Sequence, residues 1–370
     1  MINSTVKAKI GQHIIVLYLM VLMSSIILGG FGRFNTVPLL LYIIMYNYCC
    51  DNKGLIMSSC IFMFPVILFS LINKCSYLHL SLDIISFIFI YSSVYNIKYM
   101  SLDDIVCKRL FKIILILILF SILGIFSGHF RSTIEGSNRY SGFFSSSGNT
   151  SACIFCILGI IAWELQKKYY IFKNRKIVLW YLIVTYLIYV YQSETRSLLF
   201  ALPYWLYQCT QVFSKKFLLV LVLLILFFTS KSLLDNLSEK TRMEEDASYN
   251  TRMYLYLLII DGIKENWYLI PHGSHAAWDL VRLDVEAEDM STHNDFLRYI
   301  YDWGISFYLL LYFMWKSIYK NVSVNLNVLL VLLFASSFAL HNVLFNALTW
   351  MPVVILLIIN KKDDNCCQRL

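Results

Sequence analysis

The sequence predicts an all-α membrane protein with about twelve transmembrane helices and one large polar loop late in the chain. Three observations lead to this fold class. Of the 370 residues, 59% are hydrophobic and only 15% are charged, whereas soluble proteins carry about a quarter charged residues. The apolar residues gather in blocks of roughly 15 to 22, about the length that crosses a bilayer. Lipid offers the backbone no hydrogen-bond partners, so such blocks are expected to be helices.

The first apolar block, residues 13–30, follows two lysines and is long for a signal peptide, so we interpret it as the first span. The other blocks are separated by short polar links or by the large loop. The expected spans are roughly residues 13–30, 36–50, 54–72, 78–95, 110–126, 150–165, 177–192, 197–213, 217–232, 298–317, 325–341 and 344–360.

Lysine and arginine set the expected orientation, because they gather in the cytoplasmic loops of membrane proteins. With the N-terminus in the cytoplasm, the loops on that side carry most of the basic residues. The chain then divides into spans one to nine (1–232), a large outer loop (233–297), and spans ten to twelve with a cytoplasmic tail (298–370). The net charge of +8 follows from these basic loops, so no nucleic-acid partner is indicated. The opposite short loops carry only Arg33, Lys74, Arg131, Arg139 and Arg196.

Two arginines stand at the expected outer ends of apolar blocks. Arg196 lies in the short link Gln192–Ser197, beside Glu194, and Arg252 opens the apolar run that follows it. A guanidinium offers paired donors that fit phosphate oxygens, so both are candidate anion-binding residues. The alternatives are a snorkelling arginine or a local pair with Glu194. For Arg252, a helix start disfavours a cation, which favours a bound anion as its partner.

The large loop also contains a candidate base. His293 precedes an apolar run, so it is expected near the outer end of the tenth span. Imidazole titrates near neutrality and can take a proton from a hydroxyl group; a structural histidine is the alternative. His272 and His275, followed by several acids, raise the possibility of a metal site, but their spacing matches no known metal motif. We therefore expect no metal. The apolar spacing of residues 255–263 predicts an amphipathic helix at the membrane interface.

Four segments, taken in order, resemble motifs of one family. They are RYSGFFSSSGNTSA, SETRSLLFAL, TRMYLYLLIIDGIKENWYLIPHGS and STHNDFLRYIYDWGISFYLLL. Together with the late outer loop, they resemble the O-antigen polymerase and O-antigen ligase superfamily, which are bacterial integral membrane glycosyltransferases. The sequence departs from the family pattern at Asn266-Trp267, where NP is usual, and at Gly273-Ser274, where G-x-G is usual.

The resemblance implies an enzyme of the bacterial inner membrane, with its active site facing the periplasm and a role in lipopolysaccharide biosynthesis. Donor and acceptor would be glycans on undecaprenyl diphosphate, with no metal, nucleotide or other cofactor. His293 would be the catalytic base, and Arg196 and Arg252 would bind the diphosphate. Asn294, Arg131 and Arg139 would bind or orient substrate. The lipid bilayer and a chain-length regulator would be further partners.

The favoured function is polymerisation of O-antigen repeat units. The nearest alternative is an O-antigen ligase, which transfers the glycan to the lipid A core. A polysaccharide transporter or flippase is more remote, because transporters place charged or broken helices at mid-membrane. Here the expected spans are nearly free of charge, with Asp83 as the main exception.

Overall fold

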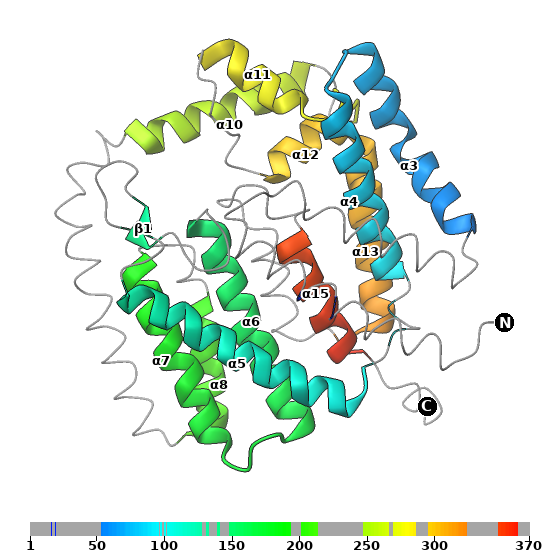
Figure 1. Ribbon diagram of the computed structural model, residues 1–370. Coiled ribbons are helices and arrows are strands. Elements are labelled where there is room, and N and C mark those ends of the chain that lie inside the picture. The colour runs from blue at the N-terminus through cyan, green and yellow to red at the C-terminus, as the bar shows by residue number, and fades with distance from the viewer. Residues whose placement is uncertain are drawn as a thin grey trace.

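The computed structural model shows an all-α fold, which confirms the predicted class (Figure 1). Of the expected spans, 36–50, 217–232 and 325–341 lie outside the described residues, as does 13–30 apart from residues 16 and 19. The residues described are 16, 19, 53–95, 97, 100, 102–127, 131–132, 139–140, 148–193, 201–213, 247–265, 269–285, 295–323 and 347–361.

The helices of these ranges follow the apolar blocks closely. A pair of two-residue strands, β1 (Arg131–Ser132) and β2 (Arg139–Tyr140), lies between α5 and α6 in the chain. The helices are α3 (Lys53–Ile72), α4 (Tyr77–Tyr95), α5 (Asp104–Phe126), α6 (Gly148–Tyr169), α7 (Arg175–Ser193), α8 (Leu202–Val212), α10 (Ala247–Glu265), α11 (Ala276–Val285), α12 (Asp295–Trp303), α13 (Ile305–Asn321) and α15 (Ala347–Ile359).

Helix α6 is the most buried helix of one part of the bundle. It packs against α5, α7 and α15, and its residues 152–165 are buried without interruption. A helix that is apolar around nearly its whole circumference is covered on every side, and here the neighbouring helices cover it. Its largest side chain, Trp163, donates a hydrogen bond from Nε1 to Oε1 of Gln208 on α8 at 2.7 Å. This bond satisfies the indole N–H inside the bundle.

Two helices of the described ranges are long and apolar enough to cross a membrane, judged by length and composition alone. They are α4 and α5. This agrees with a membrane protein, while the count of about twelve spans remains a prediction. The large outer loop was expected to hold one amphipathic helix over residues 255–263, and that segment lies within α10.

The expected single span over residues 298–317 is instead two helices, α12 and α13, separated at Gly304. Gly304 has φ +47°, a value that an α-helix cannot continue. A Cβ at this position would lie 2.5 Å from the carbonyl oxygen of Leu269. The backbone N–H of Ile305 donates to that same oxygen at 2.9 Å. The helix therefore breaks because a distant loop segment packs against its backbone.

Two lysines bond backbone carbonyl groups at one end of the bundle. Lys168 Nζ donates to the carbonyl oxygen of Ile359 at 2.7 Å, which joins the C-terminal ends of α6 and α15. Lys361 Nζ donates to the carbonyl oxygen of Met100 at 3.4 Å. The first of these lysines thus satisfies a carbonyl group at a helix C-terminus, where a cation is also favoured by the helix dipole, and the second bonds the link between α4 and α5.

The outer-loop helices lie at the opposite end. Figure 1 shows α10 and α11 across that end of the bundle, with α12 directly below them. The three helices pack on one another around a small hydrophobic cluster that is separate from the main core. Its buried members are Leu255, Ile259, Ile263, Ala277, Val281 and Tyr301. This cluster fixes the loop helices relative to the start of α12.

Candidate functional site

The structure locates three of the six predicted site residues by their backbone. Arg252 lies in α10, and Arg131 and Arg139 lie on β1 and β2. Arg196, His293 and Asn294 lie outside the described residues. The elements next to these residues are described, however, and their packing bears on where the predicted site would form.

The first such contact joins the elements around Arg252 and His293. Leu255, which follows Arg252 by about one helical turn, is fully buried in the outer hydrophobic cluster. Leu297, which follows His293 by four residues, packs against the same cluster from α12. The helix that carries Arg252 and the helix that begins just after His293 therefore pack together, although they are far apart in sequence.

The second contact concerns the strand pair. β1 and β2 are antiparallel, with Arg131 opposite Tyr140 and Ser132 opposite Arg139. The two predicted arginines therefore lie on adjacent strands, one residue apart in register. Strand β2 also contacts α7, whose last residue is three positions before Arg196. Arg131 and Arg139 are thus carried by paired strands, one of which contacts the helix that ends shortly before Arg196 in the sequence.

A network of buried polar side chains at this end was not assigned a role from the sequence. Asp83, on α4, accepts hydrogen bonds at Oδ2 from the Ser274 hydroxyl and, at 3.2 Å, from Nε1 of Trp303. The backbone N–H of Ser274 donates to Oγ of Ser70 on α3 at 2.8 Å. Each of these side chains is buried. A polar group in such a place is costly unless it is bonded in this way.

A second carboxylate, Asp302, joins the same region. Its Oδ1 accepts a hydrogen bond from the backbone N–H of Ala277 at 2.7 Å, at the start of α11. Its Oδ2 lies 3.3 Å from Nε of Arg298, which is itself buried. The guanidinium of Arg298 also acts electrostatically on Asp83. We refer to these residues as the buried polar cluster: Ser70, Asp83, Ser274, Arg298, Asp302 and Trp303.

Gly273 precedes Ser274 and lies at a backbone position that requires glycine. Its φ is +104°, which L-residues rarely adopt. A Cβ would lie 2.9 Å from Sγ of Cys75 and 2.9 Å from Cα of Ser70. Its N–H donates to the carbonyl oxygen of Asp302 at 3.0 Å. The loop therefore passes between the α3–α4 turn and the end of α12 at a point where only glycine fits.

The two loop histidines considered as metal ligands have other surroundings. The ring of His272 stacks on Tyr301, with centroids 3.9 Å apart and planes at 8°. The ring of His275 lies against His79, with centroids 3.8 Å apart. Within the described ranges, no group of three or more His, Cys, Asp or Glu residues could hold a metal ion.

His275 gives a prediction about pH. Burial lowers its pKa from 6.5 to about 3, and the positive charge of Arg298 and the neighbouring His79 act in the same direction. The folded protein therefore keeps His275 neutral while the unfolded chain protonates it below about 6.5. The contribution of His275 to the free energy of unfolding is fully present above that pH. It is expected to fall as the pH is lowered towards about 3.

The measurement is thermal unfolding between pH 8 and pH 4 for the wild type and for His275→Asn. Asparagine is neutral and tolerates the observed φ of +68°. The variant is expected to match the wild type at pH 8 and to lose less stability at pH 4. An identical pH dependence in the two proteins would contradict the assignment.

The comparisons with family models, curated proteins and solved structures give no match. The described part of the site is a network of buried polar side chains that holds the loop against α3, α4 and α12. A sequence signal for it existed: Asp83 is an acid inside an apolar block, which is rarely present without a partner.

Proposed function

We propose that this chain is a multi-pass membrane glycosyltransferase that joins lipid-linked O-antigen repeat units at the periplasmic face of the inner membrane. The order of the four motif segments supports the proposal at the level of sequence. One structural observation carries it further: the helix with Arg252 packs on the helix that begins just after His293. A donor diphosphate and an acceptor hydroxyl would need such an arrangement, with cation and base at one end of the bundle.

In the proposed reaction, His293 takes the proton from a hydroxyl group of the acceptor glycan. The freed oxygen attacks the anomeric carbon of the donor, and a new glycosidic bond forms as the bond to the diphosphate oxygen breaks. Arg196 and Arg252 stabilise the charge that develops on the departing undecaprenyl diphosphate. Asn294, Arg131 and Arg139 bind or orient the two substrates. Negative charge on the leaving group is met by guanidinium groups, so no metal ion is required by this scheme.

The buried polar cluster has a supporting role in this proposal. It fixes Ser274 and the start of α11 to α4 and α12 through the bonds of Asp83 and Asp302. Because α10 and α11 pack on each other, the position of Arg252 depends on that anchoring. A shift of about 1 Å between cation and base can cost about a hundredfold in rate. We therefore expect the cluster to act by positioning.

Deleting the gene from its bacterial host tests the proposal. A polymerase deletion is expected to leave lipopolysaccharide that carries the core and a single repeat unit on a gel. A bare core, with long polymer accumulating on the lipid carrier, would instead identify the chain as the ligase. Normal lipopolysaccharide would contradict both functions and favour a transporter of another glycan.

The same deletion strain provides a test of the arginine roles. Plasmid-borne Arg252→Ala and Arg196→Ala are expected to reach the membrane but fail to restore long chains. Lysine at either position should rescue poorly, since a point charge does not reproduce the paired donors of guanidinium. Full restoration by a lysine variant would count against a bidentate contact with the diphosphate.

A further inference from the structure

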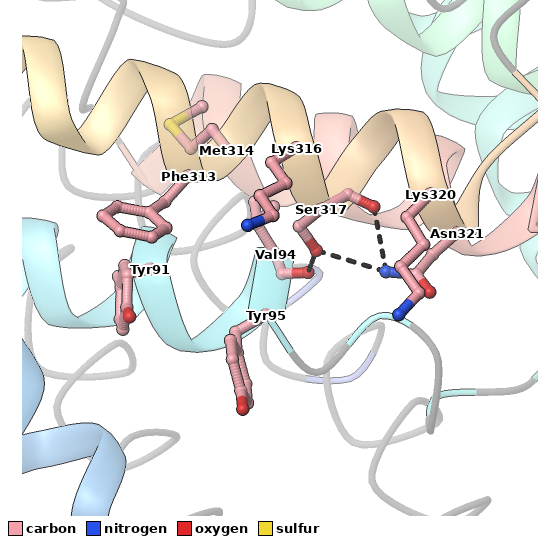
Figure 2. Close-up of a pocket in the computed structure, with 9 residues that line it drawn as sticks. All are labelled: Tyr91, Val94, Tyr95, Phe313, Met314, Lys316, Ser317, Lys320 and Asn321. Carbon is pink, nitrogen blue, oxygen red and sulfur yellow. Dashed lines mark hydrogen bonds between the residues drawn. The ribbon is translucent and has the colours of Figure 1, made fainter.

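A cavity opens between α4 and α13 at the end of the bundle opposite the outer-loop helices. Its volume is about 260 Å³. Figure 2 shows the nine side chains that line it. They are Tyr91, Val94, Tyr95, Phe313, Met314, Lys316, Ser317, Lys320 and Asn321. None of the described residues in this lining is acidic, so the cavity is cationic overall.

The cavity has an apolar part and a polar part. Towards the middle of the helices, the Tyr91 and Phe313 rings meet edge to face with centroids 6.4 Å apart. Towards the helix ends, Lys316 and Lys320 lie one turn apart on α13, and Figure 2 shows both amino groups extending to the side on which Tyr95 lies. A ligand that fits both parts carries a negative charge next to an apolar group.

The wall of the cavity is held in place by hydrogen bonds. The Ser317 hydroxyl donates to the carbonyl oxygen of Val94 at 2.7 Å, which joins α13 to α4. Asn321 Nδ2 donates to the Ser317 carbonyl oxygen at 2.9 Å. The cavity is therefore formed before any ligand arrives, which lowers the conformational cost of binding.

The two lysines are available to an anion. In the part of the chain that the structure describes, neither lies within salt-bridge distance of a carboxylate, and both are exposed. Lys316 lies over the ring of Tyr312, with Nζ 5.8 Å from the centroid. That contact leaves the three ammonium donors able to bind an oxygen acceptor.

The position of the cavity indicates which kind of molecule supplies the anion. It lies at the C-terminal end of α4, one of the helices long and apolar enough to cross a membrane. This is also the end at which Lys168 and Lys361 bond backbone carbonyl groups. On α13, the aromatic residues Tyr312, Trp315 and Tyr319 are exposed beside the lysines, as is typical of a helix at the bilayer–water interface. Phosphate groups of lipids lie at this depth.

We infer that this cavity binds the headgroup of an anionic glycerophospholipid, with its phosphate between Lys316 and Lys320. The start of its acyl chains then lies along Tyr91 and Phe313. The inference depends on membrane insertion and not on the proposed glycosyl transfer, because the cavity is at the other end of the bundle. A free phosphate ion would use the lysines but leave the aromatic part empty, and this difference separates the two sources.

Native mass spectrometry of the detergent-purified full chain, titrated with phosphatidylglycerol or phosphatidylcholine, tests the site. The wild type is expected to retain phosphatidylglycerol preferentially. The double variant K316Q/K320Q should bind it about 30-fold more weakly, from the loss of two basic contacts near a membrane surface. The control is K108Q/K112Q, which removes two exposed lysines with the same spacing from α5. An equal loss of phosphatidylglycerol binding in both double variants would mean that general surface charge causes the effect, and it would contradict the proposed site.

A second measurement needs no variant. The protein is placed in nanodiscs of phosphatidylglycerol or phosphatidylcholine, and its lysines are acylated by an amine-reactive label. Peptide mass spectrometry then measures the labelling of each lysine. Phosphatidylglycerol is expected to protect Lys316 and Lys320 but not Lys108 and Lys112. Absence of this selective protection contradicts the inference. Equal protection in phosphatidylcholine discs supplied with inorganic phosphate would assign the cavity to the free ion and overturn the lipid assignment.

Discussion

Replacing His293 by alanine is expected to reduce glycan transfer by a factor of about 10² to 10⁴, the range over which a general base contributes. The acceptor hydroxyl cannot lose its proton readily without a base close to it. Binding of the donor should persist, because the phosphate contacts are assigned to arginines. The measurement is the single-turnover rate of purified protein in nanodiscs with lipid-linked repeat units, alongside donor binding by native mass spectrometry.

His272 supplies the matched control for this experiment. It belongs to the same loop, but its ring is stacked on Tyr301 and its Nδ1 lies 3.1 Å from the carbonyl oxygen of that residue. His272→Ala is expected to affect transfer only mildly. Partial rescue of the His293 variant by added imidazole, with no rescue of the His272 variant, would identify the missing function as proton transfer. A His293 variant with normal rate would remove this residue from the mechanism.

The second large effect is expected on stability. Asp302→Ala removes a fully buried carboxylate that bonds Arg298 and the first turn of α11. The guanidinium would then lose the carboxylate that it contacts, and breaking a buried ion pair in this way typically costs about 3–5 kcal/mol. We expect a large drop in the unfolding temperature. The measurement is circular dichroism in detergent, with the monodispersity of the sample recorded alongside.

Two variants test the reason for this loss. Arg298→Met combined with Asp302→Leu removes both charges, so it is expected to recover much of the stability lost in the single variant. Asp261→Ala disrupts the exposed pair of Asp261 and Lys264, at 3.2 Å on α10, and should leave stability nearly unchanged. If Asp302→Ala were as mild as Asp261→Ala, the buried polar cluster would not anchor the loop as described.

The helices within the described ranges were largely predictable because membrane-length apolar blocks leave the backbone few alternatives. α4, expected at residues 78–95, is Tyr77–Tyr95, and α7, expected at 177–192, is Arg175–Ser193. The amphipathic spacing also located part of α10 within the loop. These features depend on local composition and period, which a single sequence contains.

The break at Gly304 was not predictable from the same information. Gly304 lies inside a stretch of the length expected for one span, and glycine occurs often within membrane helices. The break results from the carbonyl oxygen of Leu269, which is 36 residues away in sequence and bonds the N–H of Ile305. Nothing in the local pattern shows that a loop will pack against this point.

The buried polar cluster was missed for a related reason. Asp83 was noticed as an acid in an apolar block, but its partners Ser274 and Trp303 follow it by 191 and 220 residues. Pairings at that separation leave no periodic signal. The roles of Arg196, Arg252 and His293 were drawn from residue type and motif order, and they remain predictions that the experiments above address.

The long separation between Asp83 and its partners also has a consequence for biosynthesis. In the proposed topology, α4 enters the membrane while Ser274 and Trp303 have yet to be synthesised. At about 5–20 residues per second, the first of them follows roughly 10–40 seconds later. An acid at the centre of a span raises the cost of insertion by about 3 kcal/mol, and the apolar residues of α4 must offset it, which they do to a mean hydropathy of 1.5 with Asp83 included. Insertion of α4 and completion of its hydrogen bonds are therefore separate events, and in the interval the nascent chain holds an acid in the bilayer before its permanent partners exist.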